Sequence, residues 1–251
     1  MDLGLEGKAV VLTGASRGIG KAAALAFAAE GANVSICARG AEALDAAAAE
    51  IGARGVRVHA AVCDVKDPRA LVEFLEGSRA ALGGVEVLVN GASGFSPGND
   101  EASWEAGWAV DVMTTVRATQ TVAPWMEAAG GGAIVNVASI AALTAGMPPA
   151  YSAAKAAVIS QGKNAALELA PKGIRVNTVA PGSIDFPGGI WDRIRTGMPE
   201  HYQATLASIP SGRFGRPEEV ADAIVYLASA RASWISGVCL EVDGVQHRGT
   251  F

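Results

Sequence analysis

The sequence is poor in cysteine and histidine. It contains 3 cysteines among 251 residues, and Cys37, Cys63 and Cys239 stand far apart along the chain, without a CxxC pair. This spacing excludes a disulfide framework and is typical of reduced, buried thiols in a cytosolic (cytoplasmic) protein. The histidines also number 3. His201 and His247 are isolated and lack metal-ligand spacing, so no metal site is predicted.

The chain also lacks a large excess of charge of either sign. Lys and Arg number 20 and Asp and Glu number 25, which gives a net charge of −5. Without a long basic run, the chain lacks the electrostatic signature of nucleic-acid binding or of attachment to an anionic membrane. Half of the residues are hydrophobic and 18% are charged, which excludes an intrinsically disordered chain.

Long apolar runs near the start of the sequence are missing as well. The apolar run at residues 9–12 is too short for the core of a signal peptide. Residues 128–154 carry no charge and are long enough to cross a bilayer. However, this stretch contains Gly130-Gly131-Gly132, Asn136 and Pro148-Pro149, so we expect a loop, a buried strand, another loop and the start of a helix.

Short apolar runs alternate with longer, alanine-rich stretches along the chain. Most of the runs lack polar alternation, as do strands covered on both faces; they span residues 9–12, 34–37, 56–62, 85–89, 133–137, 176–180 and 238–242. Alanine is the best helix former, and the clearest stretches are residues 20–30, 41–51, 69–82 and 153–169. The pattern predicts an α/β fold. We expect a doubly wound parallel sheet of about seven strands with helices on both faces, in one domain over residues 1–251.

Residues 183–213, called the lid segment below, are the least regular part of the chain. They combine helix-breaking residues such as Pro187 and Gly188-Gly189 with aromatic residues such as Trp191 and Tyr202. An insert that is apolar yet interrupted in this way predicts a lid over a substrate pocket.

A glycine-rich turn follows the first predicted strand. Residues 13–20 read Thr-Gly-Ala-Ser-Arg-Gly-Ile-Gly, so that the glycines are spaced G-x-x-x-G-x-G, and a helix is expected directly afterwards. Such a turn lets backbone N–H groups approach a phosphate, and the start of a helix favours its negative charge. A tight turn without a ligand is the alternative, which the strand–turn–helix context makes less favourable.

This turn is the first of five motifs that occur in a familiar order. The others are Asn90-Gly91-Ala92, Ser139, the pair Tyr151-x-x-x-Lys155, and Pro181-Gly182. Over residues 6–244 the chain therefore resembles the short-chain dehydrogenase/reductase family. The resemblance implies a Rossmann-type fold, a nicotinamide cofactor, and hydride transfer to or from a carbonyl or an alcohol. The cofactor-binding residues it implies are Gly14, Ser16, Arg17, Gly18, Ile19, Gly20, Arg39, Asp64, Val65, Asn90, Ala92, Tyr151, Lys155, Pro181, Gly182 and Ile184.

The charges at the end of the second predicted strand bear on the choice of cofactor. An acid there would bond the ribose 2′-hydroxyl and repel a 2′-phosphate, whereas an arginine accommodates that phosphate. Ala38 leaves no acid in place, Arg39 follows it, and Arg17 adds a second positive charge in the glycine-rich turn. We therefore predict NADP(H) rather than NAD(H). The alternative is that both arginines are solvated surface charges.

The candidate catalytic residues are Ser139, Tyr151 and Lys155. Tyrosine has an ordinary pKa of about 10, and a nearby cation favours its ionised form. Tyr151 and Lys155 are four residues apart, so on a helix they share one face; alone, such a pair is more often an ordinary surface pair. The resemblance assigns the general acid/base role to Tyr151, and gives Lys155 the roles of stabilising the phenolate and holding the nicotinamide ribose. It gives Ser139 the role of positioning the carbonyl, with a turn or capping bond as the alternative.

The chain departs from the family pattern at three places. The family usually has an asparagine in the helix after the fourth strand, where this chain has Asp111. A carboxylate there adds negative charge near Lys155, which raises the pKa of that lysine and weakens its effect on Tyr151. In addition, Asn90-Gly91-Ala92-Ser93 replaces the usual Asn-Asn-Ala-Gly, and Phe186 stands where a threonine often contacts the carboxamide.

Apolar residues near these motifs suit an apolar or aromatic carbonyl substrate, although ordinary core packing explains them equally well. The candidates are Phe95, Met147, Phe186 and Trp191. The family is commonly tetrameric, and residues 104–127 and 150–169 are the faces expected for a homotetramer.

The predicted function is hydride transfer between NADP(H) and a carbonyl compound or secondary alcohol. The first alternative is a cofactor-binding member with little or no turnover that acts as a sensor or structural partner; Asp111 is the feature that favours it. A weaker alternative is a dehydratase or an epimerase.

Overall fold

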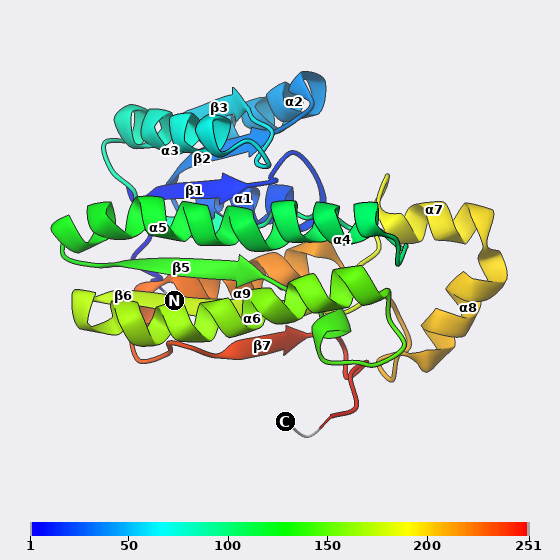
Figure 1. The fold of residues 1–251 in the computed structure, drawn as a ribbon. Coiled ribbons are helices and arrows are strands. Elements are labelled where there is room, and N and C mark those ends of the chain that lie inside the picture. Colours follow the sequence, from blue (N-terminus) through cyan, green and yellow to red (C-terminus); the bar gives the residue numbers. More distant parts are fainter. Residues whose placement is uncertain (1, 250–251) are drawn as a thin grey trace.

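The computed structural model describes residues 2–249, which form a central sheet covered by helices on both faces (Figure 1). Its seven strands run in the order β3-β2-β1-β4-β5-β6-β7, and each neighbouring pair is parallel. The strands are β1 Ala9–Thr13, β2 Asn33–Ala38, β3 Val58–Val62, β4 Val87–Asn90, β5 Gly132–Val137, β6 Ile174–Pro181 and β7 Cys239–Val242. The single-domain, doubly wound Rossmann-type architecture expected from the sequence is confirmed.

Helices fill the connections between the strands. In Figure 1, α5 and α6 lie in front of the sheet, and α1 and α9 lie behind it. The helices are α1 Gly18–Ala29, α2 Ala41–Gly52, α3 Pro68–Leu82, α4 Glu101–Gly107, α5 Met113–Ala128, α6 Pro149–Leu169, α7 Ile190–Gly197, α8 Pro199–Ser208 and α9 Pro217–Ala228. Shorter turns are the π-helical η1 Trp108–Val112 and the 3₁₀ turns η2 Ile140–Ala142, η3 Ala170–Lys172 and η4 Ala230–Ala232.

The winding of the sheet reverses at β1. This strand pairs with β2 on one side and with β4 on the other. Its residues Val10, Val11 and Leu12 have no exposed surface, because helices cover both faces, and this explains why the strand lacks polar alternation. Ligands of doubly wound sheets bind outside the carboxyl ends of the strands at such a reversal, so the fold directs attention to this edge.

Strand β6 is tied to the end of α9 by one partly buried arginine. The guanidinium of Arg175 donates to the carbonyl oxygens of Leu227, Ala228 and Ser229 at 2.6, 3.0 and 3.0 Å. The last carbonyls of a helix have no partner within the helix, and Arg175 supplies one. This contact fixes the strand whose end carries Pro181-Gly182.

The lid segment is more regular than its sequence indicates. It contains helices α7 and α8, which project beyond the sheet at the right of Figure 1. Pro199 occupies the first turn of α8, a position that tolerates proline because the missing N–H would have no partner there. The prolines and glycines therefore mark the ends of two helices rather than a continuous loop.

The sequence also predicts buried, reduced cysteines and no segment that crosses a membrane. The three cysteines are free thiols; Cys37 and Cys63 are buried and Cys239 is partly buried. Within residues 2–249, none of the helices combines the length and the apolar character needed to cross a membrane.

Candidate active site

Four strands deliver the motifs to the same edge of the sheet. The glycine-rich turn follows β1, Gly91-Ala92 follows β4, Ser139 follows β5, and Gly182 follows the last residue of β6. Because β1, β4, β5 and β6 are adjacent and parallel, their carboxyl ends lie side by side. The fold therefore assembles motifs that are far apart in the sequence.

The glycine-rich turn forms a tight cradle at the start of α1. Gly14 has a φ of +71°, and a Cβ at this position would lie 2.7 Å from the Cα of Ala92, so only glycine fits. The N–H groups of Gly14 and Ala15 both donate to the carbonyl of Cys37, at 3.1 and 3.2 Å, which fixes the turn against β2. No side chain caps the start of α1 at Arg17. The first N–H groups of this helix are therefore available to an anion, and the cradle fits a dinucleotide phosphate.

The lid segment rests on this cradle. The ring of Phe186 lies against Gly18, where a Cβ would come within 2.5 Å of the ring carbon Cζ. The guanidinium of Arg17 also donates to the carbonyl of Gly188 at 3.2 Å. Phe186, expected to contact substrate, therefore lies against the glycine-rich turn.

The residues expected around the adenosine lie at the ends of β2 and β3. Arg39 is exposed immediately after β2. Asp64 is also exposed and accepts the N–H of Lys66 at 3.1 Å, whereas Val65 is buried and its carbonyl accepts the hydroxyl of Thr114 at 3.1 Å. The fold thus places Arg39, Asp64 and Val65 at neighbouring strand ends beside the cradle.

Asn90 and its successors connect β4 to the cradle. The Asn90 amide donates to Oδ1 of Asn136 on β5 at 2.9 Å, so its side chain bonds within the sheet. The hydroxyl of Thr13 accepts the N–H of Gly91 at 3.2 Å, which joins the ends of β1 and β4. The Oδ1 atom of Asn90 is buried and accepts no hydrogen bond from the described residues.

Tyr151 and Lys155 lie one turn apart on α6. The helix begins at Pro149, as the Pro148-Pro149 pair predicts, because proline suits the first turn. The Lys155 ammonium lies 5.8 Å from the centre of the Tyr151 ring and donates to the carbonyl of Val137 at 2.7 Å. Tyr151 is partly exposed and Lys155 is buried. The pair therefore presents a phenol to the edge of the sheet with a buried cation behind it.

Ser139 caps the start of the turn η2, two residues after the end of β5. Its hydroxyl oxygen accepts the N–H of Ala141 at 3.1 Å, which is the capping bond considered as its structural role. A hydroxyl has one proton to donate in addition to its acceptor lone pairs. This bond uses an acceptor position and leaves the proton available, so capping and contact with a substrate oxygen are compatible.

Asp111 lies in the π-helical turn between α4 and α5, and both of its oxygens face donors. Oδ1 lies 2.7 Å from the Lys155 ammonium, and Oδ2 accepts the N–H of Gly94 at 2.8 Å. The side chains of Asp111 and Lys155 are 0% and 3% exposed. Burial lowers the pKa of Lys155, but the neighbouring Asp111 carboxylate and Tyr151 outweigh it, so that the pKa is raised overall. The expected charge near Lys155 is present as a direct contact.

Of the four substrate candidates, Phe95 is the one whose ring contacts Tyr151. The two rings meet edge to face with centres 5.0 Å apart, and Phe95 is 41% exposed. Met147 is also exposed. Trp191 instead packs against His201 of the lid segment and against Phe214, which follows the segment; the ring centres are 5.9 and 5.0 Å away.

Sequence reasoning missed the contacts that hold the lid segment. Oδ2 of Asp185 accepts the hydroxyl of Tyr202 and the guanidinium of Arg195, each at 3.0 Å. The amide of Gln246 clamps Ser183 by accepting its N–H at 2.8 Å and donating to its hydroxyl at 3.0 Å. These partners are distant in the sequence, and no motif pairs them.

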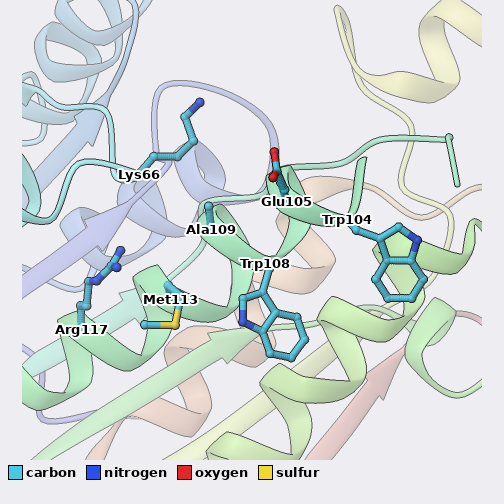
Figure 2. A pocket seen from close by; sticks show the side chains of 7 residues that line it. All are labelled: Lys66, Trp104, Glu105, Trp108, Ala109, Met113 and Arg117. Atoms are coloured by element: carbon cyan, nitrogen blue, oxygen red, sulfur yellow. The ribbon is translucent and has the colours of Figure 1, made fainter. Parts of the chain in front are cut away.

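A hollow is lined by side chains of α4, η1 and α5 (Figure 2). This open groove measures about 510 Å³. It is lined by Lys66, Trp104, Glu105, Trp108, Ala109, Met113 and Arg117. Trp104 and Trp108 are 41% and 49% exposed, and none of the candidate catalytic residues lines the groove. It is therefore separate from the Tyr151 site and falls on a face expected to self-associate.

Comparison with known proteins shows the family to which the chain belongs. Residues 14–245 match the family model described as Enoyl-(Acyl carrier protein) reductase. The chain is 35% identical to 7alpha-hydroxysteroid dehydrogenase of Escherichia coli, across 97% of this chain and 95% of that protein. It is 39% identical to 3-oxoacyl-(acyl-carrier-protein) reductase of Thermotoga maritima, across 96% and 98% of the two chains.

Two solved structures share the fold closely, each with a TM-score of 0.91 and 35% identity. One is 7 alpha-hydroxysteroid dehydrogenase complexed with NADH and 7-oxo glycochenodeoxycholic acid, with 99% of this chain and 98% of that one covered. The other is L-sorbose reductase from Gluconobacter frateurii complexed with NADPH and L-sorbose, with 99% and 100% covered. These relatives are oxidoreductases of alcohol and carbonyl groups that bind nicotinamide cofactors. The chain belongs to the short-chain dehydrogenase/reductase family.

Proposed function

We propose that the protein transfers a hydride between NADP(H) and a carbonyl compound or secondary alcohol, with Tyr151 as the general acid/base. The observation that carries this proposal is the Lys155 ammonium, buried 5.8 Å from the centre of the Tyr151 ring and anchored to the carbonyl of Val137. A buried cation this close stabilises negative charge that develops on the Tyr151 oxygen during proton transfer. Tyr151 can then exchange a proton with a substrate oxygen.

Each residue of the site has a distinct task in carbonyl reduction. When bound, the nicotinamide supplies the hydride that reaches the carbonyl carbon. The Ser139 hydroxyl donates a hydrogen bond to the substrate oxygen, and Tyr151 transfers its hydroxyl proton to that oxygen as negative charge develops. Lys155 stabilises the negative charge left on the Tyr151 oxygen. It donates one N–H to the carbonyl of Val137 and forms an ion pair with Asp111, and an ammonium has three N–H donors, so it can also bind the nicotinamide ribose.

The cradle at the start of α1 would hold the cofactor phosphates. Its main-chain groups belong to Gly14, Ser16, Gly18, Ile19 and Gly20. On the β6 side, Pro181, Gly182 and Ile184 would border the nicotinamide, and on the other side Asp64, Val65, Asn90 and Ala92 would border the adenosine.

NADP(H) is the proposed cofactor because the end of β2 offers a cation and no acid. Arg39 is exposed there, and Arg17 adds a second charge at the cradle. The solved relatives include both an NADH complex and an NADPH complex, so local charge is what distinguishes the two here. Charge-assisted hydrogen bonds contribute about 1.5–3 kcal/mol each. We expect Arg39→Asp to weaken NADPH binding by about 10- to 100-fold without weakening NADH binding, and an unchanged preference would refute this assignment.

The test of the reaction is NADPH oxidation with a panel of ketones and β-keto esters. Tyr151→Phe removes the exchangeable proton and keeps the ring, so turnover should fall by about 100- to 10,000-fold while NADPH binding stays unchanged. Tyr202→Phe is the matched control, because it removes a hydroxyl that bonds Asp185 in the lid segment. Turnover retained in Tyr151→Phe would refute the assignment.

A second candidate function is cofactor binding with little turnover, as in a sensor or structural partner. The direct contact between Asp111 and Lys155 favours it, because the carboxylate offsets part of the positive charge that Tyr151 needs. Tight NADPH binding without turnover of any compound in the panel would support this candidate over the first.

Two structural roles belong to the same proposal. The lid segment would close over the substrate beside Phe95 and Met147. The exposed Trp104 and Trp108, together with the surface of α6, would form the contacts of a cytoplasmic homotetramer. Sedimentation of the purified protein tests the assembly, and a monomer at micromolar concentration would contradict it.

A further inference from the structure

The carboxyl group of Asp111 is buried against two donors. Its two oxygens each face a donor, the Lys155 ammonium at 2.7 Å and the Gly94 N–H at 2.8 Å. A protonated carboxyl group would turn an O–H toward one of these donors, whereas a carboxylate only accepts. The buried contact with Lys155 is therefore between an anion and a cation.

The pocket around Asp111 suits a carboxylate better than an amide. The side-chain amide of asparagine has one acceptor oxygen, and its NH₂ group would face either Lys155 or the Gly94 N–H. A buried donor that loses its acceptor is destabilised. The aspartate that replaces the usual asparagine therefore provides an acceptor oxygen for each of the two surrounding donors.

The charged and titratable groups around this pair are few. Helix α6 contributes Lys155 and Tyr151, and Tyr151 raises the pKa of Lys155 together with Asp111. The β5 side contributes the carbonyl of Val137, and the loop after β4 contributes the N–H of Gly94. From α5, the hydroxyl of Thr115 donates to the main-chain carbonyl of Asp111 at 2.8 Å. Asp111 is thus the anion closest to Lys155.

We propose that Asp111 is a positioning residue that partly cancels the field of Lys155 at Tyr151, and thereby sets the pH range in which Tyr151 exchanges its proton. The inference rests on the proposed function, because it concerns the same tyrosine. An anion next to the ammonium reduces the positive potential that favours the phenolate. Removing the negative charge should therefore let Tyr151 ionise at lower pH.

Tyrosinate absorbance measures this ionisation without any substrate. The chain has 3 tyrosines, so subtracting the titration of the matching Tyr151→Phe variant isolates the signal of Tyr151. We expect Asp111→Asn to move the Tyr151 ionisation midpoint about one pH unit toward acid. Asp111→Ser, a smaller neutral residue, should move it in the same direction and serves if the asparagine variant does not fold.

Thr115→Val is the matched control. It removes the bond from α5 to the main-chain carbonyl of Asp111 but keeps the carboxylate, so it should leave the midpoint in place. A midpoint unchanged in both Asp111 variants, a shift toward alkaline pH, or an equal shift in Thr115→Val would overturn the proposal. The shift appearing in a protein that turns over no carbonyl compound would support this inference and count against the proposed function, which separates the two.

Discussion

The contact between the lid segment and the cradle can be tested through Gly18. This residue has a φ of +55°, and its missing Cβ would lie 2.5 Å from Cζ of Phe186. In Gly18→Ala the left-handed backbone costs about 1–2 kcal/mol. Displacing the ring adds about 1–3 kcal/mol, the usual cost of overpacking. We therefore expect the free energy of unfolding to fall by about 2–5 kcal/mol.

A double-mutant cycle separates the two contributions. In Phe186→Ala the ring is absent, so adding Gly18→Ala should cost only the backbone part, about 1–2 kcal/mol. Gly83→Ala is the matched control, since Gly83 has a φ of +84° and nothing within 4 Å of its missing Cβ. It should cost the same backbone part and show no coupling to Phe186.

Urea unfolding of these variants gives the result directly. Coupling of about 1–3 kcal/mol between positions 18 and 186 is expected, with the double variant more stable than the sum of the single changes. Additive effects at these positions would mean that the ring does not rest on Gly18, and the placement of the lid segment on the cradle would then be wrong.

Two further predictions concern stability. Hydrogen bonding from the Arg213 guanidinium, with help from the Arg216 N–H, lowers the pKa of Glu219 to about 2. Because the pKa of an unfolded glutamate is about 4.3, the stability gained from this interaction is complete above that pH and is lost as the pH falls toward 2. The free energy of unfolding of Arg213→Met should therefore fall less than that of the wild-type protein over this range. Parallel curves of unfolding free energy against pH for the two proteins would exclude the interaction. Replacing Arg175 with Met leaves three carbonyls at the end of α9 without their donor, so urea unfolding should show that the free energy of unfolding falls by about 3 kcal/mol. Arg175→Lys should restore only part of this loss. A loss below about 1 kcal/mol in Arg175→Met would contradict the capping role of Arg175.

The strands were predictable because burial on both faces leaves uninterrupted apolar runs in the sequence, and most helices were predictable because they are rich in alanine. The run at 133–137 corresponds to β5, Gly132–Val137, and the stretch at 41–51 corresponds to α2, Ala41–Gly52. The lid segment was predicted less well. Its prolines and glycines mark helix ends as well as loops, so composition did not distinguish two short helices from an irregular insert.

Part of the candidate site was likewise predictable from the sequence, and part was not. The four-residue spacing of Tyr151 and Lys155 was enough to place them on one helical face. The contact of both Asp111 oxygens was not predictable, because it depends on a π-helical turn that no periodicity indicates. The contact of Phe186 with Gly18 joins segments far apart in the sequence, and the apolar character of Phe186 suited substrate binding equally well.

The most direct test of the chemistry is single-turnover transfer from NADPH carrying deuterium at the transferring position to a ketone that the protein reduces. The wild-type protein should deliver one deuterium to the carbinol carbon. Tyr151→Phe should bind the same cofactor with unchanged affinity and deliver deuterium at least about 100-fold more slowly. Deuterium transfer at the wild-type rate in Tyr151→Phe would show that the phenol beside the Lys155 ammonium is not the proton donor.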